Sequence, residues 1–274
     1  MPHKLEELAN HYTLLIDTSI YGGIQGDYSN ELFREGLSGL SNIPTETMQI
    51  RLQNIQNIND SLNAIQGRNI FTIKEVIREL KEGLKFQNNY YTLLNNRTKY
   101  VEADIRKRTP KIFRKNDSYK KKIGNRKIKL HRDFCDELFE LKYLLERRTF
   151  IPSRNFNKEE ENTYPAFLKM CNDIFEDIRS KDLIKKAEHE NPMYLGYNLR
   201  TDAKLVATTF TLAYEKPIAL ISEDKGIKIL VGRILGALRS QEDKDFYDIS
   251  QRPANEIHVF KRNPESYDGS FIYA

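Results

Sequence analysis

Residues 202–226 read DAKLVATTFTLAYEKPIALISEDKG, and this stretch decides the class of fold. Residues 202–215 are apolar around most of a helical circumference, which predicts a helix that is buried on two sides. Residues 217–221 form a short uncharged run, which predicts a central strand of a sheet. Residues 222–226 are typical of a turn, and the pattern beyond them predicts another helix up to Arg239. This succession indicates an α/β protein.

The same alternation of helices and strands extends toward both ends of the chain. Residues 12–16 (YTLLI) predict a buried strand, and residues 69–72 predict a second strand that runs into a helix over 74–86. The remaining expected elements are helices within 29–65, 134–145 and 167–178, and a terminal strand at 257–260. Because strands separated by helices pair in parallel, we expect a three-layer α/β/α fold with a central, mostly parallel sheet.

Composition narrows the class of protein. The 274 residues are 39% apolar and 30% charged, which is typical of a soluble globular protein. No apolar run approaches the roughly 18 residues of a membrane span, and acidic residues near the N-terminus argue against a signal peptide. Cys135 and Cys171 are too few for a disulfide framework or a four-cysteine zinc site. We therefore expect a cytoplasmic protein with reduced thiols and no membrane partner.

Positive charge is concentrated in one basic segment, residues 106–132. It holds thirteen Lys or Arg residues and one acid, Asp117, so it carries +12, whereas the whole chain carries +5. The other residues therefore sum to −7 (5 − 12). Such concentration favours a polyanionic partner, because Lys and Arg that neutralise phosphates release condensed counterions. Pro110 and Gly124 are expected to break any helix in the segment, and a solvated loop is the alternative interpretation.

Acidic residues lie where the predicted strands and helices meet. Asp17 follows the first strand, Asp224 lies three residues beyond the central strand, and Asp202 opens the helix before that strand. Glu75 and Glu79 lie on one face of the helix after the second strand, and spacing alone leaves the choice between them open. Ligands of open parallel sheets bind beyond the carboxyl ends of the strands. Acidic clusters suit Mg²⁺ or Mn²⁺, which can activate water for attack on a phosphodiester.

Four stretches resemble, in their order, the motifs of the PIN-domain nuclease family: LLIDTSIY (14–21), TIKEVIREL (72–80), TDAKLVATTFTLA (201–213) and PIALISEDKGI (217–227). The resemblance implies an α/β/α fold and a divalent-metal-dependent ribonuclease that cleaves RNA through clustered acids. It also implies one PIN-like domain over 1–274. Compact members of that family are much shorter, so we expect 86–197 to be a helical insertion that contains the basic segment.

Carried over to this sequence, the resemblance implies four catalytic acids that hold Mg²⁺ or Mn²⁺: Asp17, Glu79, Asp202 and Asp224. It favours Glu79 over Glu75, because the acid of that motif directly precedes a helix leucine, here Leu80. Supporting hydroxyl groups that orient a ligand or water are expected at Thr18, Ser19 and Ser222. A further Asp of the family pattern is Gly226 here, so the expected site holds four acids.

The expected function is a metal-dependent endoribonuclease whose basic segment holds the RNA backbone. The residues expected to bind nucleic acid are Arg106, Lys107, Arg108, Lys111, Arg114, Lys115, Lys120, Lys121, Lys122, Arg126, Lys127 and Lys129. Two alternatives stay open: an inactive nucleic-acid-binding module with the same fold, and a structure-specific nuclease for single-stranded or branched DNA of the flap type. A protein inhibitor or antitoxin and a homo-oligomer also stay open as partners.

Overall fold

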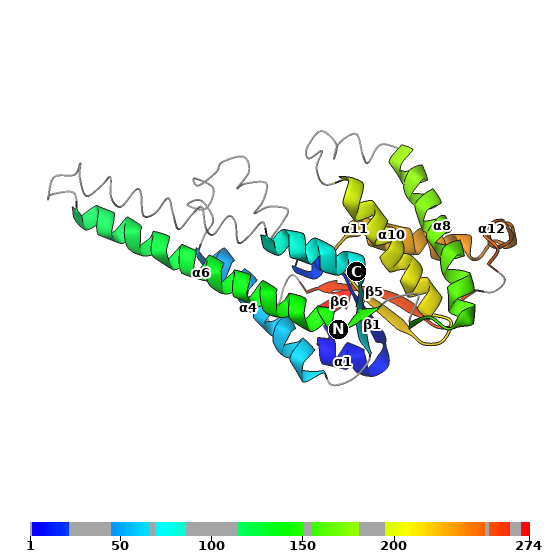
Figure 1. The fold of residues 1–274 in the computed structure, drawn as a ribbon, viewed down its shortest axis with the longest axis horizontal. Coiled ribbons are helices and arrows are strands. Elements are labelled where there is room, and N and C mark those ends of the chain that lie inside the picture. The colour runs from blue at the N-terminus through cyan, green and yellow to red at the C-terminus, as the bar shows by residue number, and fades with distance from the viewer. Residues whose placement is uncertain are drawn as a thin grey trace.

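The computed structural model describes residues 2–21, 45–65, 69–85, 114–150, 155–180, 195–249, 252–263 and 270–274. Within these residues one sheet has the strand order β3–β2–β1–β4–β5–β6 (Figure 1). Its strands are β1 (Thr13–Ile16), β2 (Ile70–Ile73), β3 (Thr149–Phe150), β4 (Ile218–Ile221), β5 (Ile257–Arg262) and β6 (Phe271–Tyr273). All neighbouring strands pair in parallel except β5 and β6. The expected α/β class with a mostly parallel sheet is therefore confirmed.

Two hydrophobic cores lie on opposite faces of the sheet. One is built by α1 (Leu5–His11), α4 (Thr45–Ala64), α6 (Arg114–Glu146) and the helix over 74–85. The other is built by α8 (Lys158–Ser180), α10 (Leu195–Leu212) and α11 (Lys225–Ala237). Successive residues of a strand point to opposite faces, so Leu14 and Ile16 enter the first core while Leu15 enters the second. This arrangement is compatible with the expected three-layer fold.

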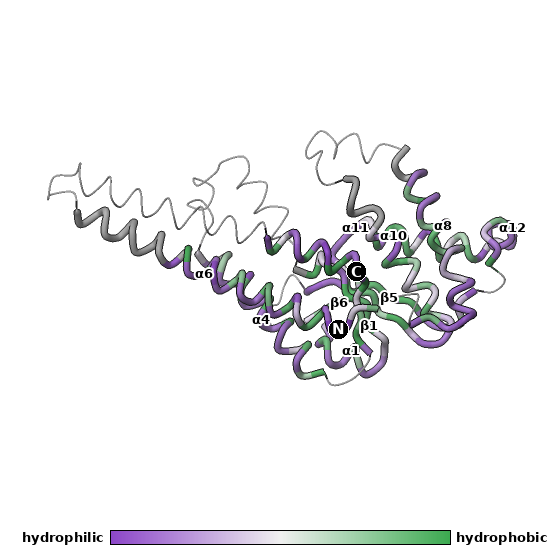
Figure 2. The backbone as a smooth tube through the Cα atoms, viewed as in Figure 1, coloured by the Kyte–Doolittle hydropathy of each residue, from purple (hydrophilic) through white to green (hydrophobic). Residues whose placement is uncertain are grey.

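The two central strands explain why the sheet forms where it does. Every residue of β1 and β4 is buried, as expected for uncharged strands that are covered on both faces. Their parallel register aligns Ile16 with Ile221, so the carboxyl ends of the two strands are level. Figure 2 shows the hydrophobic positions concentrated where the helices meet the sheet. The residues that follow β1 and β4 therefore share one edge of the sheet.

Several elements differ from the sequence-based expectation. Gly124 does not break a helix, because α6 continues through it from Arg114 to Glu146. A single glycine costs a helix only about 1 kcal/mol, which the surrounding Lys, Arg, Ile and Leu residues can offset. Within the described residues, the helical pattern expected over 29–65 corresponds to α4. Residues 29–44 lie outside the described residues. The short elements α1, β3, β6, η1 (Thr18–Tyr21) and α12 (Gln241–Phe246) were not predicted.

The range 86–197, expected as a helical insertion, contributes to the main body of the structure in its described parts. β3 lies inside this range and pairs with β2 at one edge of the sheet. α8 also lies inside it and supplies Phe167 and Met170 to the core that it shares with α10. Residues 86–113, 151–154 and 181–194 lie outside the described residues.

The opposite edge of the sheet is covered by the start of the chain. β6 pairs with β5 on one side, and on its other side His3 and Phe271 exchange two backbone hydrogen bonds of 2.7 Å each. Figure 1 accordingly shows the two chain ends in the same region of the molecule. Among the described residues, no helix combines the length and the apolar character that a membrane crossing requires.

Candidate active site

Two strand ends and two helices position the predicted acids. Asp17 directly follows β1, and Asp224 lies three residues beyond β4. Glu79 lies in the helix that begins where β2 ends. Because α10 runs back toward the start of β4, its N-terminal half, which holds Asp202, lies at the carboxyl edge of the sheet. The parallel topology therefore collects residues from four distant segments at one edge.

Asp17 is the most buried of the predicted acids, with 3% of its surface exposed. Its backbone N–H donates to the carbonyl of Ile221 at 3.1 Å, which ties it to the end of β4. Its Oδ2 accepts from the Ser19 N–H at 3.3 Å, from Ser222 Oγ at 2.9 Å and, at closer range, from Ser19 Oγ. The other oxygen, Oδ1, has only a long contact of 3.4 Å with Thr18 Oγ1.

The pKa of the Asp17 carboxyl is raised above its ordinary value. Burial raises this pKa most, and the hydrogen bonds from Ser19 and Ser222 lower it. The negative charge of Asp224 raises it again. Two of the predicted supporting residues, Ser19 and Ser222, thus favour the ionised form of Asp17. Burial and the charge of Asp224 disfavour that form.

The two carboxylate oxygens of Glu79 differ in their hydrogen bonding. Thr18 Oγ1 donates to its Oε2 at 2.9 Å, whereas its Oε1 is buried and has no hydrogen-bond partner among the described residues. Burial is the main cause that raises the pKa of the Glu79 carboxyl, and the Asp17 charge adds to it. Hydrogen bonds from Thr201 and Thr18 oppose this rise. A buried, unpaired carboxylate oxygen is costly unless a ligand satisfies it.

Asp202 has the most strongly perturbed carboxyl of the four. Burial raises its pKa well above the ordinary value, and the charges of Asp17, Asp224 and Glu79 raise it further. Within the described residues, every charge that acts on Asp202 in this way belongs to another carboxylate. The structure thus brings the other three predicted acids within electrostatic reach of Asp202.

Asp224 also has a local structural role. It is the N-cap of α11, and its Oδ1 accepts the backbone N–H of Gly226. A Cβ at residue 226 would lie 2.9 Å from that oxygen, so any larger residue there would force the capping side chain of Asp224 to shift. The position where the resemblance calls for a further Asp is therefore occupied by the residue that accommodates Asp224.

The choice between the two glutamates of the second motif is explained by their partners. Glu75 forms an ion pair with Lys204 of α10, and both side chains are partly exposed. Glu79, one helical turn later, interacts with Asp17 and Asp202 instead. The geometry therefore groups Glu79, and not Glu75, with the other acids.

Three further residues lie at this site and were missed in the sequence. Thr201, only 1% exposed, precedes Asp202 and hydrogen-bonds the Glu79 side chain. Glu223 and Arg262 form an ion pair between the end of β4 and the end of β5. Thr201 opens the motif TDAKLVATTFTLA (201–213), directly before Asp202. This adjacency could have identified it as a site residue. No local pattern links Glu223 with Arg262, which lie 39 residues apart.

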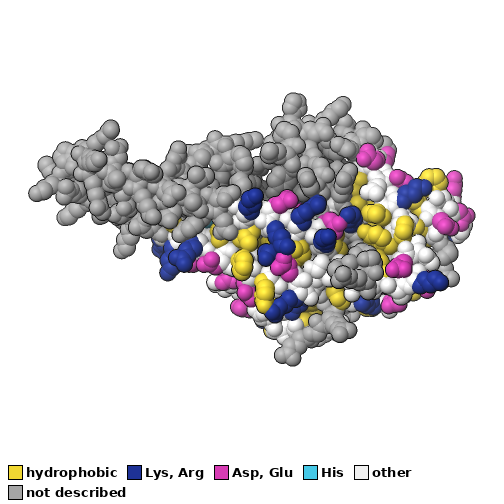
Figure 3. All heavy atoms as spheres, viewed as in Figure 1, with side chains coloured by type: hydrophobic (Ala, Val, Ile, Leu, Met, Phe, Trp, Pro, Cys, Tyr) yellow, Lys and Arg dark blue, Asp and Glu magenta, His cyan; other side chains and the backbone are white. Residues whose placement is uncertain are grey.

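The predicted nucleic-acid-binding residues are only partly described. Arg106, Lys107, Arg108 and Lys111 lie outside the described residues. The other eight lie on α6, and of these only Arg126 and Lys129 have described side chains, both exposed. On the face shown in Figure 3, positive and negative side chains are interspersed over the described surface. That part of the face carries no single-sign field.

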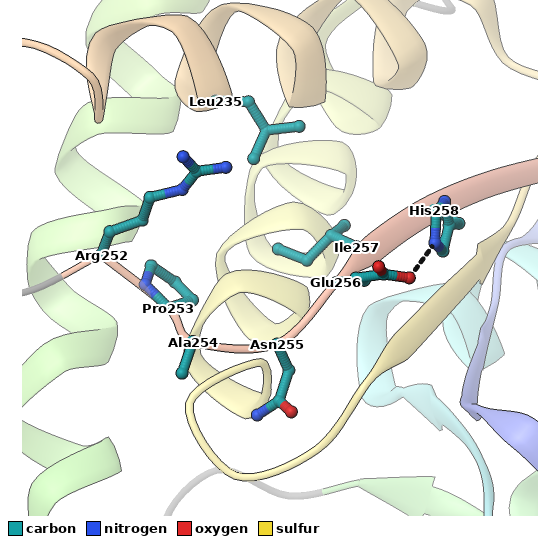
Figure 4. Close-up of a pocket in the computed structure, with 8 residues that line it drawn as sticks. All are labelled: Leu235, Arg252, Pro253, Ala254, Asn255, Glu256, Ile257 and His258. Atoms are coloured by element: carbon teal, nitrogen blue, oxygen red, sulfur yellow. Dashed lines mark hydrogen bonds and ion pairs between the residues drawn. The ribbon is translucent and has the colours of Figure 1, made fainter.

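The structure also contains a cavity of about 530 Å³, whose lining residues are shown in Figure 4. It is lined by residues 252–258, at the amino end of β5, and by Leu235 of α11. Because β4 and β5 are parallel, this end of β5 is opposite the edge that carries Asp17 and Asp224. The cavity and the acidic group are therefore separate features.

The donor atoms of the acidic group fit Mg²⁺ or Mn²⁺. Both ions prefer oxygen ligands, and the group offers carboxylate oxygens of which Glu79 Oε1 is buried and unpaired. Among the described residues, no three His, Cys, Asp or Glu side chains already meet as a ready-made ligand set. Asp17, Glu79, Asp202 and Asp224 are the residues that would hold a metal.

Comparison with protein-family models, with curated proteins and with solved structures gives no match for this chain.

We expect Gly226→Ala to be less stable than Gly232→Ala by about 1 kcal/mol, because the new Cβ at residue 226 displaces the Asp224 cap of α11 and so cancels the gain in helix propensity. Urea unfolding measures this change. Gly232→Ala in the same helix is the matched control, since a Cβ there meets no atom within 4 Å. The control should stabilise the fold by about 0.5–1 kcal/mol, because alanine is the better helix former. Equal effects at the two positions would contradict this role of Gly226.

We expect Asp202→Asn to stabilise the metal-free chain at pH 7. A carboxyl whose pKa is higher in the folded chain binds more protons there, so stability falls as the pH rises above about 4. Each unit of raised pKa costs about 1.4 kcal/mol once the pH exceeds both values. Urea unfolding in EDTA should therefore show a gap that closes below about pH 4.

Glu242→Gln, which changes an exposed carboxyl on α12, serves as the control for this pH series. Equal stability of the Asp202→Asn variant and the unmodified chain at pH 7 would contradict the electrostatic picture of the site. A gap that widens in acid would do the same.

Proposed function

We propose that this chain is a divalent-metal-dependent ribonuclease in which Asp17, Glu79, Asp202 and Asp224 hold Mg²⁺ or Mn²⁺. One observation carries the proposal: four acids from distant segments meet at the edge where β1 and β4 end level, so that the charges of Asp17, Glu79 and Asp224 all act on the buried Asp202. Such a group is unfavourable by itself, because like charges repel at close range. A divalent cation removes that repulsion, and a set of oxygen donors suits Mg²⁺ or Mn²⁺.

The chain's own residues prepare the acids for this task. Ser19 and Ser222 hold Oδ2 of Asp17, and Thr18 holds Oε2 of Glu79. One oxygen of each carboxylate is thereby fixed by hydroxyl groups, while Asp17 Oδ1 and Glu79 Oε1 remain for a ligand. The bound metal would supply Lewis acidity and an activated water for phosphodiester hydrolysis. Preorganised ligands need little rearrangement when the ion binds.

The basic segment supports the assignment of a nucleic-acid substrate. α6 carries Arg126 and Lys129 with exposed side chains, close to the point where the helix leaves the core at His131. Exposed cations on an extended helix suit a phosphate backbone rather than a small ligand, because the charge is spread along the helix. The choice of RNA over DNA and of internal cleavage follows from the PIN-domain resemblance, and both are part of the proposal.

We expect the purified chain to cleave single-stranded RNA in Mn²⁺, and EDTA to abolish the cleavage. Asp202→Asn should reduce the rate by at least about a hundredfold, because it removes a charged ligand of the ion. Glu75→Gln is the matched control, since Glu75 pairs with Lys204 and should change the rate little.

The same assay includes single-stranded, branched and circular substrates. Cleavage of branched DNA in preference to RNA would favour the flap-type nuclease, and cleavage of circular RNA would establish internal cutting. Salt-sensitive binding without cleavage of any polymer would favour the inactive binding module over the proposed nuclease.

We expect Arg126→Glu/Lys129→Glu to weaken RNA binding and to flatten its dependence on salt. Each phosphate contact with a single strand contributes about 0.7 to the slope of log K against log salt, so two lost contacts should lower the slope by about 1.4. Lys158→Glu/Arg239→Glu, at two exposed positions away from α6, changes the net charge equally. An unchanged slope, or the same loss in both variants, would contradict a role for the basic segment.

A further inference from the structure

Arg262 makes a two-point ion pair near the acidic group. It is the last residue of β5, and its guanidinium contacts both carboxylate oxygens of Glu223, which follows β4. Nη2 lies 3.0 Å from Oε2, and Nε lies closer to Oε1. The two side chains are only 19% and 27% exposed. A fork-like pair that is partly shielded from water fixes the relative geometry of its partners better than a single surface contact does.

Glu223 connects this ion pair to Asp17 through its backbone. Its N–H donates to Ser19 Oγ at 2.8 Å, and Ser19 Oγ in turn contacts Asp17 Oδ2. A hydroxyl has one proton, so an N–H aimed at the Ser19 oxygen leaves that proton for Asp17. A donor chain therefore runs from the loop after β4 to the buried carboxylate.

The next residue of the loop repeats this arrangement. The Asp224 N–H donates to Ser222 Oγ at 3.1 Å, and Ser222 Oγ donates to Asp17 Oδ2 at 2.9 Å. Both hydroxyl groups thus receive a backbone N–H and give their proton to the same oxygen. Their mutual distance of 2.9 Å follows from this shared target. The position of residues 222–224 therefore decides how Asp17 is held.

We propose that Arg262 is a positioning residue for the acidic group: it holds the loop at 222–224 through Glu223 and so directs the Ser19 hydroxyl toward Asp17. This inference rests on the proposed metal-dependent function, because its consequence is that the Asp17 carboxylate is oriented for metal binding. Arg262 need not contact metal or substrate. Its pairing with Glu223 also neutralises the charge of a fifth acid, which directly precedes Asp224 in the chain.

The test measures Mn²⁺ affinity of the full chain by electron paramagnetic resonance of the free ion. Glu223→Gln/Arg262→Met removes the ion pair without changing the net charge, and it should weaken Mn²⁺ binding about fivefold, the effect of roughly one lost hydrogen bond. Glu223→Arg/Arg262→Glu restores an ion pair and should return the affinity to within about twofold. Cleavage by the neutral variant should recover at saturating Mn²⁺.

Asp177→Asn/Arg233→Met is the matched control, because it removes an exposed ion pair of 3.1 Å between α8 and α11, also at constant net charge. Unfolding in EDTA is measured in parallel, since a merely structural role would lower stability and leave Mn²⁺ affinity unchanged. If the neutral variant does not fold, Arg262→Lys replaces it, because lysine keeps the charge and loses the fork.

The outcomes separate the two proposals. If the unmodified chain does not bind Mn²⁺, or if Asp17→Asn binds it equally well, the proposed function fails. If binding requires Asp17 but the neutral variant binds like the unmodified chain, or loses no more affinity than the surface control, the role of Arg262 is overturned and the proposed function stands. Weaker binding that the exchanged pair restores supports both.

Discussion

The burial of the Asp17 carboxylate is the constraint on which this structure depends. A charge that is 3% exposed at the end of a central strand is tolerated only when hydrogen bonds replace its lost water. Those bonds come from η1, which follows β1, and from the loop that follows β4. They exist only while β1 and β4 pair with level ends. Strand register, loop conformation and the acidic group are thus aspects of one arrangement.

Much of this arrangement could be predicted because short uncharged runs mark buried strands. β1, β2, β4 and β5 were predicted from such runs, and Asp17 and Asp224 were assigned to the carboxyl edge because parallel strands end at the same edge. The short elements β3 and β6 have no pattern long enough to recognise, since they span two and three residues. Arg262 was missed because its partner is distant in sequence, and contacts of this kind depend on the fold.

The amino-acid composition of α6 changes along its length. Its described C-terminal half contributes Phe134, Leu138 and Leu141 to the core, and acidic side chains predominate among its other residues from Asp133 onward. The basic segment ends at Arg132, beside His131, which is the first buried residue among the described side chains of the helix. Over these described side chains, the charge changes sign where burial begins. Removing charged side chains from water costs free energy. A helix can therefore carry dense positive charge only where those side chains stay in contact with water.

The two edges of the sheet have a consequence for the behaviour of the protein at high concentration. Open strand edges present unpaired N–H and C=O groups that can recruit the strand of another molecule. Here one edge is β3, which is only two residues long, and the other is β6, whose outer side is occupied by His3 at Phe271. Within the described residues, neither edge offers a long template for growth by strand addition. The segment around His3 thereby protects this edge of the sheet from pairing with a strand of another molecule.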